Sequence, residues 1–143
     1  MLKAPEGKRP ILVTLPIKVQ TYDIDFAGHV NNQVYVRWLE DLRMELLRAY
    51  YPLDRLTAAG VFPVLHSTHI VYKRSIGMFD APTGVMWCTE LGRATLRLEA
   101  EFVVEGVVCA HAVQRGILLK LGTTSPARVP EELIAEFRRG IGE

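Results

Sequence analysis

The sequence lacks long apolar runs and a dominant sign of charge. No stretch of its 143 residues approaches the roughly 20 apolar residues that span a bilayer, and its start has no apolar core of a signal peptide. The 17 basic and 16 acidic residues nearly cancel. Charge therefore gives no reason to expect nucleic acid or an acidic membrane as a partner, and we predict neither.

Cysteine is scarce, and metal-binding patterns are absent. Cys88 and Cys109 have no metal or redox spacing, and both lie in strand-like segments. We therefore predict free buried thiols in a cytoplasmic protein. His66 and His69 lie three residues apart, which places them on opposite faces of a strand. We predict no metal and no cofactor.

The length of the chain favours a single domain. Residues 1–10, "MLKAPEGKRP", combine proline, glycine and basic residues. We predict that they form a flexible N-terminal tail, and that residues 11–143 form one domain.

Several segments alternate apolar and polar residues, which is typical of strands with one buried face. The segments are 11–22, 62–76 and 84–121. The last is long enough for three strands, with turns at Gly92 and at Glu105–Gly106. Pro16 favours an edge or a bulge in the first strand, because proline cannot donate to a ladder.

Between residues 32 and 50 the apolar residues recur every three or four positions, which predicts one long helix. Its apolar face comprises Tyr35, Trp38, Leu39, Leu42, Leu46 and Ala49. Arg37 and Asp41 can pair on the opposite side. Residues 130–139 begin with proline and acidic residues and end with basic ones, which predicts a short terminal helix.

This order of elements predicts an α+β fold with about five antiparallel strands wrapped around one long helix. Such a curled sheet leaves its outer face and its edges uncovered. We therefore expect the chain to associate with copies of itself.

One stretch, "DIDFAGHVNNQVYVRWLE" from Asp23 to Glu40, gathers polar residues where the long helix opens. It resembles the signature of hotdog-fold acyl thioesterases of the 4-hydroxybenzoyl-CoA thioesterase type. That signature has an Asp, a short loop with Gly, a helix opening, and then Tyr, Trp and Glu at helical spacing. The matching residues are Asp25, Gly28, Val30, Tyr35, Trp38 and Glu40. "HVNN...Y..W..E" is also similar to acyl-carrier-protein thioesterases, and the resemblance spans roughly residues 12–137.

The resemblance implies a hotdog fold and gives Asp25 and Asn32 catalytic roles. In the family this Asp is either the nucleophile or the general base. The backbone amide at Asn32 would stabilise the oxyanion, which agrees with the unpaired N–H groups and positive potential of a helix N-terminus.

His29 has two interpretations. In the carrier-protein thioesterases an Asp, an Asn and a His occupy alternate positions, and the His is catalytic. Here Ala27 stands where that Asn would be. His29 is therefore either a catalytic residue or a polar residue that caps or supports the loop.

Six further residues are candidates for substrate binding. They are Gly28, Asn31, Tyr35, Glu40, Thr68 and Tyr72. Gly28 can serve backbone geometry, Asn31 can cap the helix, and Tyr35 can be a core residue. Thr68 and Tyr72 lie on a strand that, in this family, borders the site, often from the neighbouring subunit.

The resemblance implies hydrolysis of an acyl-CoA or an acyl-carrier-protein thioester, in a homodimer or homotetramer with the site at the subunit interface. The alternative is a hotdog module that binds acyl thioesters without cleaving them. A hotdog dehydratase would use a His/Asp or His/Glu pair in motifs that differ from these. Scattered basic residues could meet phosphates, although such residues are usually solvated. They are Lys18, Arg37, Arg43, Lys73 and Arg74.

Overall fold

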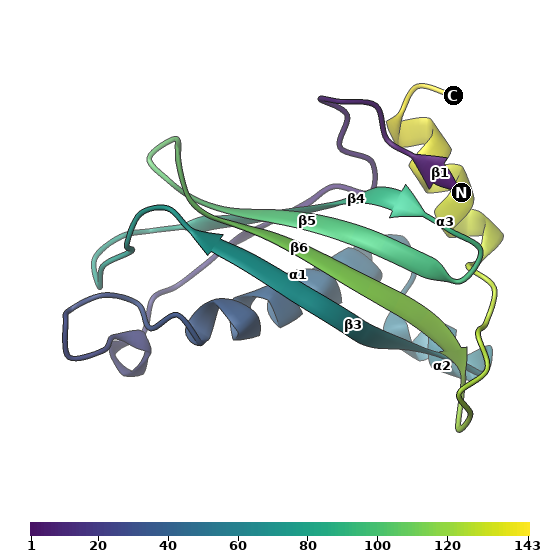
Figure 1. Cartoon of the computed structure of the whole chain (residues 1–143), viewed down its shortest axis with the longest axis horizontal. Helices are drawn as coiled ribbons and strands as arrows, with labels where there is room; N and C mark the ends of the chain where they lie inside the picture. The colour runs from purple at the N-terminus through teal and green to yellow at the C-terminus, as the bar shows by residue number, and fades with distance from the viewer.

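The computed structural model describes residues 1–143 as one sheet of six strands with a long helix against one face (Figure 1). The strands are β1 (Leu2–Lys3), β2 (Val13–Pro16), β3 (Val61–Tyr72), β4 (Thr83–Leu91), β5 (Thr95–Val104) and β6 (Val107–Lys120). The helices are α1 (Val34–Tyr50), α2 (Leu53–Ala58) and α3 (Glu131–Gly140), with a 3₁₀ turn at Thr21–Asp23. The predicted α+β class and the wrapped helix are confirmed.

All neighbouring strands are antiparallel, in the order β1-β4-β5-β6-β3, and β2 also pairs with β4. Pro16 ends β2 at this edge, where its missing N–H leaves no gap in a central ladder. β3 pairs with β6 alone, so its other side is an open edge. Glu105 and Gly106 form the β5–β6 turn with positive φ angles, as tight hairpins require.

The core lies between α1 and the inner face of the sheet. Leu39 and Leu42 of α1 are completely buried, as is Phe102 of β5. The expected apolar face of the helix is confirmed except at its end, where Ala49 is exposed. The helix ends before Pro52, because the residue preceding a proline is pushed out of the helical region; Tyr51 is extended, with φ −161°.

Helix α2 was not expected from the sequence. Its six residues are too short for a periodic pattern. It begins directly after Pro52 with Asp54 in its first turn, and it buries Leu56. It extends the cover of the sheet beyond the end of α1.

Residues 1–10, where we expected a flexible tail, lie along β4 instead. Leu2 and Lys3 pair with Leu91 and Glu90, and the guanidinium of Arg9 stacks 3.9 Å from the centre of the Trp87 ring. A two-residue strand leaves no periodic signal in a sequence, which is why the pairing was missed.

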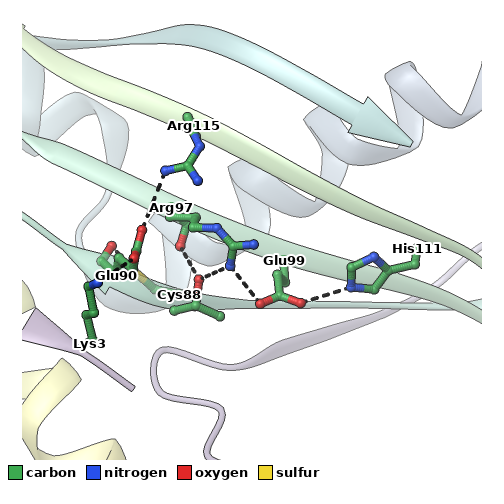
Figure 2. Close-up of polar contacts among 8 residues, drawn as sticks. Lys3, Cys88, Glu90, Arg97, Glu99, His111 and Arg115 are labelled. Atoms are coloured by element: carbon green, nitrogen blue, oxygen red, sulfur yellow. Dashed lines mark hydrogen bonds and ion pairs between the residues drawn. The ribbon is translucent and has the colours of Figure 1, made fainter. Parts of the chain in front are cut away.

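The outer face of the sheet carries a row of polar contacts (Figure 2). Glu99 accepts a hydrogen bond from Arg97 at 2.8 Å and pairs with the ring of His111 at 2.9 Å. Glu90 lies between Lys3 at 3.7 Å and Arg115 at 3.5 Å. The face of the sheet that points away from α1 is therefore stabilised by contacts among β1, β4, β5 and β6.

Both cysteines are free and buried, as predicted. Burial raises the pKa of Cys88 to about 12, and burial also raises the pKa of Cys109. None of the helices combines the length and the apolar character that crossing a membrane requires.

Candidate active site

The loop before α1 holds Asp25 in a tight, internally bonded bend. Oδ1 of Asp25 accepts hydrogen bonds from the amides of Ala27 at 2.9 Å and His29 at 3.3 Å. Its backbone amide donates to the carbonyl of His29 at 2.9 Å. Gly28 has φ +83°, a conformation that L side chains rarely adopt. Oδ2 of the half-buried Asp25 makes no hydrogen bond within the chain, so one carboxylate oxygen is available.

The bend is fixed to a neighbouring turn. His29 forms an isolated bridge with Gly77, and the amide of Val30 donates to the carbonyl of Ile76 at 2.8 Å. Ile24 and Val30 bridge across the base of the bend. Asp25 therefore projects from a braced loop rather than from a free one.

Asp23 supports the same loop from inside the protein. Its fully buried carboxylate accepts a hydrogen bond from the amide of Gln20 at 2.9 Å and forms an ion pair with Arg37. The expected pairing of Arg37 with Asp41 is therefore wrong. A buried carboxylate without a partner costs far more free energy than an exposed one, so Arg37 pairs with Asp23.

At the helix opening the backbone amide of Asn32 is free. Oδ1 of Asn31 accepts a hydrogen bond from the amide of Gln33 at 2.9 Å. The backbone carbonyl of Asn31 accepts one from the amide of Val34, also at 2.9 Å. The Asn32 amide has no partner within the chain, and the residue is exposed. In a trans peptide the C=O and N–H groups point in opposite directions. The bond to the Asn31 carbonyl therefore fixes the direction of the Asn32 N–H.

Tyr72 links β3 to this opening. Its hydroxyl donates a hydrogen bond of 2.9 Å to the carbonyl of Asn32, which fixes the next peptide as well. Tyr35, a predicted substrate-binding residue, lies in the core with a relative exposure of 2%. Its ring meets those of Tyr72 at 5.1 Å and Phe102 at 5.4 Å, so it supports Tyr72 from within.

The remaining predicted residues are divided between two regions. The exposed Gly28 and His29 lie in the bend beside Asp25, and the His29 side chain makes no hydrogen bond. Glu40 and Thr68 lie elsewhere, in and beside a mainly apolar cavity farther along α1. No group of three or more His, Cys, Asp or Glu side chains could hold a metal ion.

Sequence reasoning missed the contacts beside that cavity. Arg43, counted among the scattered basic residues, donates a hydrogen bond of 2.8 Å from Nη1 to Oε1 of Gln114. Nε2 of Gln114 donates in turn to Oγ1 of Thr68 at 3.0 Å. The one available signal was that Gln114 is polar at an alternating strand position whose neighbours on the same face, Ala110, Ala112 and Leu118, are apolar.

Residues 19–137 match the family model of the thioesterase-like superfamily. The chain belongs to this superfamily. A curated protein of Aquifex aeolicus (strain VF5), provisionally named an esterase, is 26% identical over 118 residues, covering 82% of this chain and 91% of that protein. Both matches cover most of the chain.

Solved structures agree with this assignment. A thioesterase of Thermus thermophilus, crystallised with coenzyme A and Zn, has a TM-score of 0.78 and 27% identity, covering 97% of this chain and 98% of that one. A thioesterase-superfamily protein of Jannaschia sp. CCS1 has a TM-score of 0.83 at 16% identity, covering 100% and 99%. The fold is therefore the hotdog fold of this superfamily, and the family supports acyl thioester hydrolysis as the general activity.

Proposed function

We propose that the chain hydrolyses an acyl thioester to a carboxylic acid and a thiol, with Asp25 as nucleophile or general base. The supporting observation is that one short segment presents both a carboxylate oxygen and a backbone N–H without partners. Asp25 supplies the first and Asn32 the second. The segment is braced, so little reorganisation is needed when charge develops on the substrate.

Two chemical routes use these groups. As a general base, Asp25 takes a proton from a water molecule that attacks the thioester carbonyl. The oxyanion of the tetrahedral intermediate accepts a hydrogen bond from Asn32, and its collapse expels the thiolate, which takes up the proton. As a nucleophile, Asp25 attacks the carbonyl itself, expels the thiolate and forms a mixed anhydride that water then cleaves.

We propose a CoA thioester as the substrate. The support comes from the T. thermophilus relative, which was crystallised with coenzyme A and shares 27% of its sequence with this chain. An acyl-carrier-protein thioester is the alternative, and a substrate panel separates the two.

We further propose that a second copy of the chain pairs with the open edge of β3. This strand of 12 residues has only β6 as a neighbour. Val64, Leu65 and Val71 are among its exposed apolar residues. Unpaired apolar edges of this length are rare in isolated proteins. Since β3 also carries Tyr72, this pairing brings the second copy next to the helix opening.

A binding module without turnover remains the alternative function. The free Oδ2 of Asp25 favours the enzyme, because a charged oxygen beside a neutral thioester must be partly desolvated without improving binding. A pure binder gains nothing from it.

The decisive experiment measures thiol release from acyl-CoA and acyl-carrier-protein thioesters by Asp25→Asn and Asp25→Ala. Each variant should lose at least about 10²-fold in kcat while remaining folded, which is the usual contribution of a general base. Asp41→Asn changes an exposed acid on α1 outside the loop and should keep full activity. The released thiol is measured with a thiol reagent, which the two buried cysteines of the folded protein should not consume.

Full activity in both Asp25 variants would remove Asp25 from the mechanism. Tight binding of a thioester that the wild-type protein never cleaves would establish the binding module instead.

A further inference from the structure

Arg43 is a half-buried cation without a carboxylate partner. Its one hydrogen bond goes to the neutral amide oxygen of Gln114, at 2.8 Å. No acidic side chain of the chain lies within ion-pair distance of it, whereas Arg37, Arg48 and Arg55 all have such partners. Burial lowers the pKa of Arg43, although nearby Glu40 opposes this effect. Most of its five N–H donors are therefore available to another group.

The orientation of Arg43 is fixed by two other elements. Gln114 of β6 is only 1% exposed, and its Nε2 is bonded to Oγ1 of Thr68 on β3. Because a guanidinium can only donate, Gln114 must present its oxygen to Arg43 and its NH₂ to Thr68. The guanidinium is held in place without being neutralised.

Arg43 also lines a cavity of about 230 Å³ between α1, α2 and the sheet. Thirteen of its 17 lining residues are hydrophobic. The volume is below the roughly 300–1,000 Å³ of pockets that hold complete drug-sized ligands. The cavity therefore suits the apolar tail of a longer substrate, and Arg43 gives it one cationic wall.

We propose that this cavity binds the far end of the acyl group and that Arg43 pairs with a carboxylate there. The substrate class is then the CoA monothioesters of dicarboxylic acids. This inference rests on the proposed thioesterase function and specifies its substrate. An anion inside an apolar cavity requires a cationic hydrogen-bond donor, and Arg43 is already oriented by Gln114.

The position of Arg43 sets the kind of acyl group. It follows Val34, the first residue of α1, by nine residues, which corresponds to about 14 Å along the helix axis. The proposed reaction centre lies at that helix opening. Acyl groups with a spacer between thioester and carboxylate therefore fit better than the shortest dicarboxylic acids.

Glu40 is the one acidic residue among those that line the cavity. It is exposed, lines the same cavity one turn before Arg43, and forms no ion pair with it. It leaves the guanidinium accessible, and its own carboxylate weakens anion binding. Glu40→Gln should therefore strengthen the preference for a carboxylate.

The test compares CoA thioesters of linear dicarboxylic and monocarboxylic acids of equal carbon number, across a series of increasing chain length. The wild-type protein should prefer the dicarboxylic substrate by at least about tenfold in kcat/KM at its best length, which one charged hydrogen bond supplies. Arg43→Met should abolish the preference, mainly through KM, while retaining activity on the monocarboxylic series. Arg43→Lys should restore part of it.

Two further variants make the test specific. Gln114→Glu places a carboxylate at the guanidinium and should abolish the preference as Arg43→Met does. Arg48→Met alters an exposed arginine of the same helix and should change nothing.

Equal cleavage of both series by the wild-type protein, or an equal loss on both series in Arg43→Met, would overturn the proposal. So would an Arg43→Met variant that changes only the oligomeric state, because Arg43 would then serve a contact between copies. If the wild-type protein cleaves no thioester, the thioesterase function fails. Calorimetry with free dicarboxylic acids then decides the Arg43 site: binding lost in Arg43→Met supports it, and no binding to the wild type refutes it.

Discussion

The hydroxyl of Tyr72 donates a hydrogen bond of 2.9 Å to the carbonyl of Asn32. This contact joins the edge strand of the sheet to the opening of α1. It holds the peptide that directly follows the free Asn32 amide. Tyr72, which we expected to line the pocket, is thus positioned to orient the proposed oxyanion donor.

Tyr72→Phe should lower kcat by less than about 10²-fold, because the donor remains and only its orientation loosens. Tyr50→Phe is the matched control, since its hydroxyl makes a 2.8 Å bond to the carbonyl of Leu12. Each variant should lose about 0.5–1.5 kcal/mol of unfolding free energy in urea titrations. A fall in kcat for both variants, or for neither, would show that Tyr72 has no specific role.

Gly28→Ala should disturb the bend that carries Asp25. No atom lies within 4 Å of the added Cβ, so the cost is conformational strain at φ +83°, about 1–2 kcal/mol. Gly122→Ala introduces similar strain at φ +76° in a remote turn. Both variants should melt at lower temperature, and only Gly28→Ala should lose kcat/KM. Unchanged activity in Gly28→Ala would mean that the geometry of the bend does not matter for catalysis.

The open edge of β3 predicts self-association. Sedimentation equilibrium should give a molecular mass of at least twice the 16.1 kDa of one chain. The double substitution Val64→Asp and Val71→Asp puts charges on exposed edge positions and should yield monomers. A wild-type monomer at micromolar concentration would exclude this pairing.

The contacts of Glu99 predict that part of the protein's stability is lost in acid. Burial acts to raise its pKa, but hydrogen bonds from Arg97 and His111 outweigh it and lower the pKa in the folded protein. Because the pKa of Glu99 is lower in the folded protein, its ionised carboxylate stabilises the fold at pH values above the ordinary glutamate pKa of about 4.3. That contribution is lost as the pH falls through the pKa of Glu99 in the folded protein. The unfolding free energy of the wild type should therefore fall more steeply below pH ~4.3 than that of Glu99→Gln. Parallel curves would contradict this.

The sequence predicted the features that depend on local periodicity. The α1 face and the strands of the C-terminal half follow from spacing, and the Glu105–Gly106 turn follows from its glycine. The resemblance to hotdog-fold thioesterases added the prediction that the Asp25 loop belongs to the active site. The pairing of Arg37 with Asp23 rather than Asp41 was missed, because it depends on burial that only the folded chain creates.

The contacts at Arg43 were beyond sequence reasoning for a related cause. Arg43 and Gln114 are 71 positions apart, and Gln114 and Thr68 are 46 apart. No pattern within one element relates them. They meet only because β3 and β6 pair beneath α1.

The two ends of α1 are built from different parts of the chain. The opening is braced by the preceding loop, the turn near Gly77 and Tyr72, whereas the cavity walls facing the second half of α1 come from α2, α3, the start of β3, the start of β5 and the end of β6. Substitutions in the cavity can therefore retune which acids are accepted while the reactive end stays intact. In a directed-evolution campaign, libraries confined to those walls should yield altered selectivity at undiminished turnover.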